Sequence, residues 1–344
     1  MPEPSDAAPA VLAFDGGSTK TDVLLVSASG AVLGRARVGP SNHQLVGVEG
    51  TVEALTEAVA AVMGDARLPD DGAAFPLCPT GVYCLAGIDL PVDEEKLTPA
   101  IDALGWTEHA ILRNDTFAIS RAGTTSSWGI GVVCGTGMNC AAVGPDGRTV
   151  RFPALAELSG DFAPGGAWLG LRALGLALRA GDGRGPATVL RSRVPAQLGT
   201  PDAEAALTGI YTGAIPYARL FELARVLLDA AAEGDGPARG AADTLADEIV
   251  AFVRAAVVRL DLEHEPVEVV LGGGIFDTTD TAFHARVAAG VAAVAPRAVL
   301  LHLDAPPVLG AALIGLDAVD APAGSAAALR RALRDRREGA PERG

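Results

Sequence analysis

Short apolar stretches bounded by glycine and polar residues dominate the first third of the chain. Residues 11–15, 22–28 and 31–38 have the run of Val and Leu that is typical of β-strands, and glycines lie between them. From residue 51, apolar residues recur at helical spacing. The pattern predicts strands at 11–15, 22–28, 31–38, 80–86 and 110–112, and helices at 51–63, 93–104 and 115–122.

The same order of elements then recurs. Strand, glycine turn, strand, turn and strand are predicted at 11–38 and again at 129–152. Such self-similarity predicts a duplicated domain, with its two glycine turns facing each other across a cleft. Residues 166–264 are predicted to be an insertion of helices, and residues from 324 onward a solvated, fraying helix. The remaining predicted elements are a strand at 267–271, a helix at 281–294, a strand at 298–303 and a helix at 306–316.

Composition narrows the class of protein. The net charge of -15 argues against binding to nucleic acid or to an anionic membrane. Residues 1–9 lack the basic and apolar regions of a secretory signal, and no apolar run reaches membrane-spanning length. The four cysteines, Cys78, Cys84, Cys134 and Cys140, have no zinc-ligand spacing, and we expect buried free thiols. These observations predict a cytoplasmic protein.

The first glycine turn has the composition of an anion site. Gly16 and Gly17 allow the backbone to approach a ligand closely, and successive N–H groups in such a turn form a concavity that suits anions. Ser18, Thr19 and Lys20 add donors and one positive charge. The turn therefore predicts a phosphate site, with an ordinary hairpin turn as the alternative. The chain has no GxxxxGK[ST] loop and no GxGxxG between a strand and a helix.

Two acidic residues follow predicted strands in the first repeat. Asp15 ends the first strand, and Asp115 follows the strand at 110–112, where it is also a good helix N-cap. Both carboxylates would lie at the same sheet edge if these strands are parallel neighbours. One could hold Mg²⁺ through water, and the other could accept a proton from a hydroxyl group. These are the components of phosphoryl transfer.

At these residues the chain resembles a known family. The segments 15–22, 135–139 and 272–274 resemble the phosphate and adenosine motifs of the sugar kinase, Hsp70 and actin superfamily. Residues 41–47, Ser-Asn-His-Gln-Leu-Val-Gly, resemble the sugar loop of N-acetylglucosamine kinases. Asn114-Asp115 and Ser159-Gly160-Asp161 resemble the catalytic-base segment and a second sugar-contacting segment. The branch most similar contains the N-acetylglucosamine kinases and the BadF/BadG/BcrA/BcrD ATPases.

The resemblance implies an α/β fold of two RNase H-like, actin-like ATPase domains with a cleft between them. It implies residues 10–118 and 119–317 as the domains, with the helical insertion at about 166–264 and a charged tail at 318–344. The implied activity is ATP-dependent phosphorylation of an amino sugar, most closely N-acetylglucosamine at its 6-hydroxyl, by a homodimer. Glucosamine, N-acetylmuramic acid and N-acetylmannosamine are alternative substrates, and a non-kinase ATPase activator or a sugar-binding regulator are alternative functions.

The resemblance also implies residue roles. Asp115 is the implied base and Asp15 orients the Mg²⁺ of ATP. The implied nucleotide-binding residues are Gly16, Gly17, Ser18, Thr19, Lys20, Gly135, Thr136, Gly137, Gly272, Gly273 and Gly274. The implied sugar-binding residues are Asn42, His43, Asn114, Asn139 and Asp161. His43 could equally pack inside the loop, and Asp161 could form a turn. The chain departs from the family at Ala86, where a serine is common, and after Asp161, where Phe162 follows.

Overall fold

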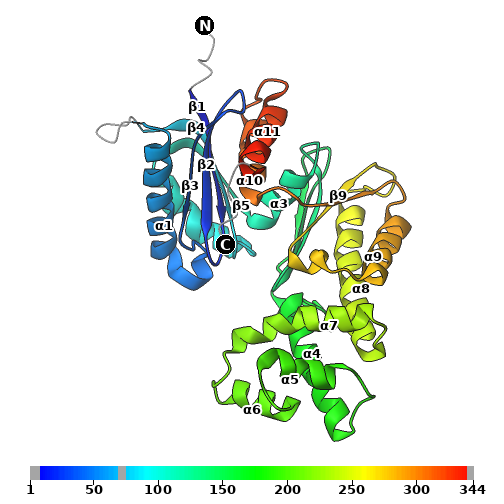
Figure 1. The fold of residues 1–344 in the computed structure, drawn as a ribbon. Helices are drawn as coiled ribbons and strands as arrows, with labels where there is room; N and C mark the ends of the chain where they lie inside the picture. Colours follow the sequence, from blue (N-terminus) through cyan, green and yellow to red (C-terminus); the bar gives the residue numbers. More distant parts are fainter. Residues whose placement is uncertain (1–7, 69–74, 339–344) are drawn as a thin grey trace. The chain divides into compact units, whose positions relative to one another are not determined.

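The computed structural model describes residues 8–68 and 75–338. The chain divides into two units by its internal contacts (Figure 1). Unit 1 comprises the described residues up to 131, residues 145–147 and the described residues from 303 onward. Unit 2 comprises residues 132–144 and 148–302. The sequence placed 306–316 in the second domain, whereas the contacts place this segment in unit 1.

The first unit contains a five-stranded sheet of order β3-β2-β1-β4-β5. Its strands are β1 (Pro9–Gly16), β2 (Thr21–Ser27), β3 (Val32–Val38), β4 (Cys78–Leu85) and β5 (Thr107–Asn114). β2 is antiparallel to both β1 and β3, whereas β1, β4 and β5 run parallel. The carboxyl ends of these three parallel strands therefore share one edge of the sheet.

Alternating side chains of the strands build a core on each face of this sheet. Leu12 and Phe14 pack among residues of α1 (His43–Asp65) and α2 (Pro91–Asp102). Val11 and Ala13 face the opposite way and pack among residues of α10 (Pro307–Ala318). α10 also packs closely against α3 (Asp115–Gly123), the helix that begins at the predicted base.

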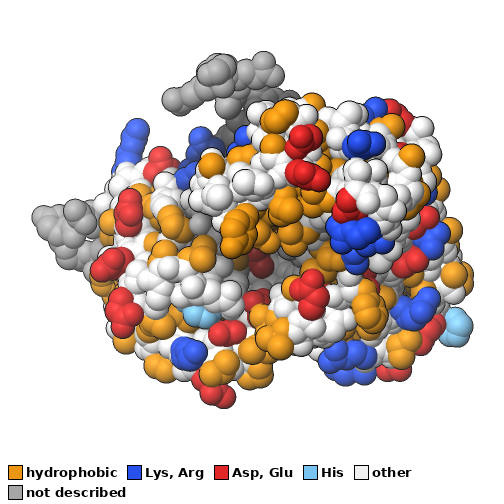
Figure 2. Space-filling view, turned by 90° about the horizontal axis from the view of Figure 1, so that it is seen from below, with side chains coloured by type: hydrophobic (Ala, Val, Ile, Leu, Met, Phe, Trp, Pro, Cys, Tyr) orange, Lys and Arg blue, Asp and Glu red, His pale blue; other side chains and the backbone are white. Residues whose placement is uncertain are grey.

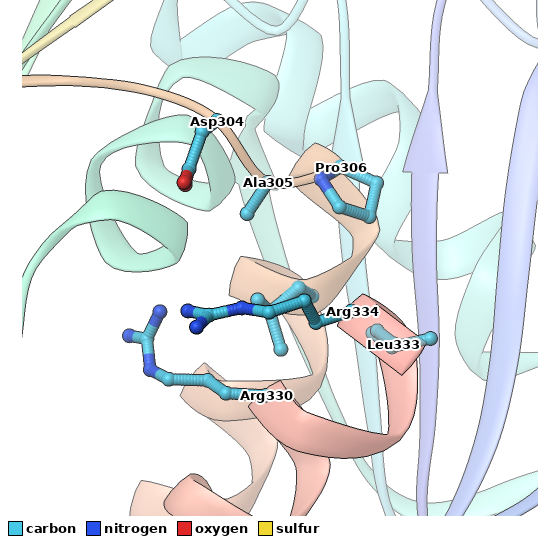
Figure 3. Close-up of a pocket in the computed structure, with 7 residues that line it drawn as sticks. Asp304, Ala305, Pro306, Arg330, Leu333 and Arg334 are labelled. Carbon is cyan, nitrogen blue, oxygen red and sulfur yellow. The ribbon is translucent and has the colours of Figure 1, made fainter. Parts of the chain in front are cut away.

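The C-terminal segment differs from the sequence-based expectation. Its helix, α11 (Ser325–Glu338), packs on unit 1 through the buried residues Leu329 and Leu333, so it is not a solvated helix. The apolar positions lie four apart and so share one helix face. α11 also borders a cavity of about 390 Å³, into which Arg330 and Arg334 extend from the side opposite Asp304 (Figure 3). Residues 339–344 of the predicted tail lie outside the described residues.

The second unit repeats the strand order of the first. Its sheet has the order β10-β9-β6-β7-β8, which read from β8 is third, second, first, fourth and fifth strand, as in unit 1. The strands are β6 (Gly129–Cys134), β7 (Met138–Val143), β8 (Thr149–Arg151), β9 (Glu268–Gly272) and β10 (Val299–His302). This order supports the duplication predicted from the two glycine turns.

Helices fill the long interval between β8 and β9, as the sequence predicted. They are α4 (Gly166–Asp182), α5 (Leu190–Leu198), α6 (Ala203–Tyr211), α7 (Leu223–Ala232) and α8 (Gly236–Arg259), and α9 (Thr281–Val294) follows β9. Short 3₁₀ helices are η1 (Ala156–Ser159), η2 (Tyr217–Glu222) and η3 (Gly274–Asp277). The predicted α/β class with a helical insertion in the second repeat is confirmed.

The surface and the cysteines agree with the composition. On the face shown in Figure 2, Lys and Arg side chains are scattered among Asp and Glu and do not gather in one patch. All four cysteines are buried free thiols, as predicted. Within residues 8–68 and 75–338, no helix combines the length and apolar character needed to cross a bilayer.

Candidate active site

The first glycine turn joins β1 to β2 and is built as a tight hairpin. The Gly17 N–H donates to the Lys20 carbonyl at 2.8 Å, which closes the turn. The Gly16 carbonyl accepts from the Ala86 N–H at 2.7 Å, so the turn is also tied to the end of β4. Ser18, Thr19 and Lys20 are exposed at its tip, where their donors are accessible to a ligand.

Lys20 is engaged by a neighbouring acidic residue. Its ammonium lies 2.9 Å from the Asp22 carboxylate, and Arg37 donates to the same carboxylate at 2.6 and 3.0 Å. Although burial opposes ionisation, the Arg37 and Lys20 cations hold the pKa of Asp22 below its ordinary value. The Lys20 side chain is 46% exposed, and its role toward a phosphate stays a prediction.

Asp15 lies at the shared edge of the parallel strands. It pairs in register with Cys84 of β4, which pairs with Arg113 of β5. Burial and, after it, the negative charge of Asp115 together raise the pKa of Asp15 to about 7. The two carboxylates that the sequence placed at one sheet edge therefore interact electrostatically.

Asp115 is the first residue of α3, directly after β5. Asn114 caps the helix, because its side-chain oxygen accepts from the Thr116 N–H at 3.0 Å. Asp115 is thus not the N-cap, and its carboxyl is left for another role. Burial raises the pKa of Asp115 to about 6, the charge of Asp89 adds to the rise, and the Thr116 N–H opposes it. Such a group is suited to accept a proton near neutral pH.

The predicted sugar loop lies beside the first glycine turn. The Asn42 side chain donates to the Ser18 hydroxyl at 3.0 Å and accepts from the Gln44 N–H at the same distance. Asn42 thereby caps α1 and contacts the turn at once. Gly87 has a φ of +84°, and a Cβ atom at this position would collide with the Asn42 side-chain oxygen at 2.5 Å. Glycine is required at this approach.

His43 points into the protein from the same loop. Its Nε2 lies 3.2 Å from the Asp93 carboxylate, and only 8% of its side chain is exposed. Nδ1 is buried with no hydrogen-bond partner among the described residues. This geometry favours the packing interpretation of His43 that the sequence left open, and a contact with sugar stays a prediction.

The second glycine turn joins β6 to β7 and is held by the start of α4. The N–H groups of Gly166 and Ala167 donate to the carbonyls of Gly135 and Thr136 at 2.9 and 2.8 Å. The turn is closed by the Gly135 N–H, which donates to the Gly137 carbonyl at 2.9 Å. Unit 2 therefore fixes its glycine turn with backbone hydrogen bonds, as unit 1 does.

The turn after β9 lies next to the second glycine turn of unit 2. Gly273 has a φ of +100° and lies so close to the Cys134 carbonyl that only glycine fits. Gly274 and the second glycine turn line one cavity of about 360 Å³. Its lining residues are Gly135, Thr136, Gly166, Phe221, Ala224, Arg225, Leu228, Gly274, Ile275, Asp277 and Thr278. The mixed apolar and polar lining suits a nucleoside with phosphates at its glycine end.

The other predicted residues of unit 2 do not line this cavity. Asp161 is buried and accepts from the Ser159 hydroxyl at 2.7 Å. Asn139 is half-buried in β7, where its side chain accepts from the Cys140 N–H at 2.7 Å. The roles of Asn139 and Asp161 toward a sugar stay predictions.

Sequence reasoning missed several residues at both places. In unit 1 it missed Asp89 and Asp93, which lie in the connection after β4 and in the first turn of α2. In unit 2 it missed Phe221 and Arg225, which come from η2 and α7. Helices of an insertion carry no local motif, so only the fold brings these side chains to the glycine turns.

The sequence pattern of one known family matches nearly the whole chain. The pattern of the BadF/BadG/BcrA/BcrD ATPase family matches residues 13–315, which include both glycine turns and Asp115. The chain belongs to the BadF/BadG/BcrA/BcrD ATPase family. This membership confirms the resemblance drawn from these segments.

Two relatives of this chain are named as sugar kinases. An N-acetylmuramic acid/N-acetylglucosamine kinase from Clostridium acetobutylicum is 26% identical over 267 residues, which cover 78% of this chain and 85% of the relative. An N-acetyl-D-glucosamine kinase from Dictyostelium discoideum is 24% identical over 315 residues, which cover 89% of this chain and 97% of the relative.

Solved structures agree with the family membership. A protein from Chromobacterium violaceum, assigned as an N-acetylglucosamine kinase, superposes with a TM-score of 0.67 at 26% identity, over 90% of this chain and 99% of that chain. A ROK hexokinase from Thermus thermophilus has a TM-score of 0.53 at 18% identity, over 90% and 99% of the two chains. The second likeness shows the fold alone.

Proposed function

We propose that this chain is an ATP-dependent kinase that phosphorylates an amino sugar, with N-acetylglucosamine as the first candidate. The observation that carries the proposal is the Asp115 carboxyl at the start of α3, whose pKa burial raises to about 6. A base with this pKa is ionised at neutral pH and still accepts protons readily. The family and the kinase names of the relatives support the same reaction.

The proposed transfer is one displacement at phosphorus. The sugar 6-hydroxyl loses its proton to the Asp115 carboxylate while its oxygen forms a bond to the γ-phosphorus. The bond between that phosphorus and the bridging oxygen breaks, and ADP leaves with the bonding electrons. The candidate groups within unit 1 are the base and the N–H groups of the turn at Gly16 to Thr19. Those within unit 2 are the turn at Gly135 to Gly137 and the cavity for the nucleoside.

Asp15 fits a Mg²⁺ ion that accompanies ATP. Burial and the charge of Asp115 raise the pKa of Asp15 to about 7, so this edge of the sheet favours added positive charge. A bound Mg²⁺ would neutralise charge on the phosphates, and the Asp15 carboxylate would orient it. The carboxylate oxygens are the ligands that this hard cation prefers.

The identity of the sugar depends on residues of the candidate sugar site. Asn42, His43, Asn114, Asn139 and Asp161 are the candidate contacts, and the chain departs from the N-acetylglucosamine kinases at Ala86 and Phe162. One relative is named for N-acetylmuramic acid as well as N-acetylglucosamine. N-acetylmuramic acid is therefore the second candidate substrate, ahead of glucosamine and N-acetylmannosamine.

The ATPase activator remains a weaker alternative. An activator that shares an iron–sulfur cluster between subunits requires thiolates at a surface, whereas Cys78, Cys84, Cys134 and Cys140 are all buried. Burial also raises the pKa of each thiol. A homodimer stays a prediction, which light scattering after size-exclusion chromatography would check.

ADP release with a panel of sugars tests the proposal. The panel contains N-acetylglucosamine, N-acetylmuramic acid, glucosamine, N-acetylmannosamine and glucose, each with ATP and Mg²⁺. We expect one of the amino sugars to raise ADP release far above background, and Asp115→Asn to lower that rate by about 100-fold or more while ATP still binds. Background release with every sugar, or wild-type turnover in the variant, would contradict the proposal.

A further inference from the structure

Asp89 lies between two residues of the candidate sugar site. It belongs to the connection between β4 and α2, which is neither strand nor helix. Its Oδ1 accepts from the Asn114 side chain at 3.0 Å, and its Oδ2 accepts from the Gln44 side chain at 3.3 Å. Gln44 also donates to the Gly87 carbonyl at 3.0 Å. The Asp89 carboxylate therefore links Gln44, at the start of α1, to Asn114, which directly precedes Asp115.

The backbone of Asp89 is also held by hydrogen bonds. The buried Asp93 carboxylate accepts from the N–H groups of Asp89 and Leu90 at 3.2 and 2.8 Å. The other oxygen of Asp93 pairs with His43 Nε2 at 3.2 Å. Hydrogen bonds to both its side chain and its backbone therefore hold the Asp89 carboxylate in place next to Asn114.

The Asn114 amide is oriented by two hydrogen bonds. Its nitrogen donates to Asp89, and its oxygen accepts from the Thr116 N–H at 3.0 Å. A rotated amide would lose both bonds, so the Asp89 carboxylate selects the orientation that caps α3. Asp115 follows this cap directly. Loss of Asp89 would loosen the first turn of α3, where the proposed base lies.

We propose that Asp89 is a positioning residue for Asp115, which holds the Asn114 cap and places a negative charge opposite the Asp115 carboxyl. The inference rests on the proposed function, in which Asp115 is the base. Asp89 needs no contact with substrate for this role. Its effect passes through the geometry of Asn114 and through the electric field at Asp115.

Charged and titratable groups reach Asp115 from each neighbouring element. Asp15 of β1, Cys84 of β4 and Arg113 of β5 interact with one another or with Asp115 across the sheet edge. On the other side of α3, Arg121 pairs with Asp317 of α10 at 2.7 Å. Asp89 is the carboxylate that adds most, after burial, to the raised pKa of Asp115. We therefore expect its neutralisation to lower that pKa.

Asp89→Asn tests the proposal because it keeps the shape of the side chain and removes the charge. Asp102→Asn is the matched control, since Asp102 is an exposed aspartate at the end of α2 and the net charge changes equally. We expect Asp89→Asn to lower kcat about ten-fold at pH 8, with KM for ATP unchanged. The acid limb of its kcat profile should move to lower pH by about half a pH unit or more.

A purely structural role predicts a different result. It would lower kcat and thermal stability together and leave the acid limb where it lies in the wild-type protein. That outcome, or an equal movement of the limb in Asp102→Asn, would overturn the proposal. Asp89→Ser, which is smaller and also uncharged, replaces Asp89→Asn if the latter does not fold, and the same movement is expected.

A direct titration separates this inference from the proposed function. The carboxyl carbon of Asp115 can be followed by NMR from pH 4 to pH 8 in the wild-type chain and in Asp89→Asn, with Asp115→Asn assigning the signal. A lower pKa in Asp89→Asn supports the inference even if no sugar is phosphorylated. Identical titrations overturn it even if the kinase activity is established.

Discussion

Replacement of Asp115 by asparagine should stabilise the protein near neutral pH while it removes the proposed base. The carboxyl is desolvated at the start of α3, and burial raises its pKa from 3.8 to about 6. Folding therefore disfavours the charged form. Asparagine has nearly the same shape, can accept from the Thr116 N–H, and has no charge to desolvate.

The size of this stabilisation and its dependence on pH follow from the raised pKa of Asp115. At pH 4, close to the ordinary pKa of 3.8, the folded chain keeps its proton and the unfolded chain has lost only part of it, so the substitution changes stability much less than at higher pH. As the pH rises from 3.8 through 6, the folded chain keeps a proton that the unfolded chain has lost, and wild-type stability falls. A rise from 3.8 to about 6 corresponds to about 3 kcal/mol as an upper limit. Because Asp115 is half-buried by accessible surface, we expect about 1–2 kcal/mol above pH 7.

Urea denaturation of both proteins at pH 4 and pH 8 measures this difference. Asp115→Asn should unfold at higher urea than wild type at pH 8 and at nearly the same urea at pH 4. Asp102→Asn, whose aspartate is exposed, should show no such pattern. An Asp115→Asn protein that is less stable than wild type at pH 8, or a gain of equal size at both pH values, would refute the reasoning.

Three further predictions concern the turns and the helix that carry the site. Because Arg37 lowers the pKa of Asp22 against the effect of burial, Asp22→Asn should lose about 1–3 kcal/mol of stability at pH 7, and the loss should shrink as the pH falls from 3.8 through the lowered pKa, as measured by urea denaturation. Gly310→Ala would drive a methyl group into the Ala118 carbonyl where α10 crosses α3, so thermal melting should show a loss of about 1–3 kcal/mol. Gly273→Ala, at a φ of +100°, should weaken ATP binding about ten-fold or more in calorimetric titration; unchanged values in any of the three would contradict the corresponding argument.

Much of the fold could be predicted from the sequence because its signals are local. Apolar runs that end in glycine turns marked β1, β2, β6 and β7, and the second occurrence of the same order predicted the repeated sheet that the structure contains. The place of Asp115 could be predicted for a similar reason, since a residue directly after an apolar strand lies at the edge where the parallel strands end. These signals lie within a few residues of the features that they predict.

The rest depends on contacts between residues that are distant in sequence. Asp89 and Asn114 are separated by 25 positions, and no sequence pattern around either residue predicts the hydrogen bond between them. The prediction of a solvated C-terminal helix was wrong for the same reason. Its many arginines favour a solvent-exposed helix when the segment is considered alone. Leu329 and Leu333 are buried only because the fold brings this helix against the core of unit 1.

Electrostatics at the sheet edge distinguishes a catalyst from a protein that only binds sugar. A binding protein needs polar groups that hydrogen-bond to hydroxyls, and ordinary ionised aspartates at a partly wet surface suffice for that. Here Asp15 and Asp115 are both desolvated at one edge of the sheet, and burial raises their pKa values to about 7 and about 6. That arrangement destabilises the fold, yet it suits one group to accept a proton near neutral pH and the other to lie beside a cation, as proposed for Asp115 and Asp15. Phosphoryl transfer to a hydroxyl group needs both, and binding alone needs neither.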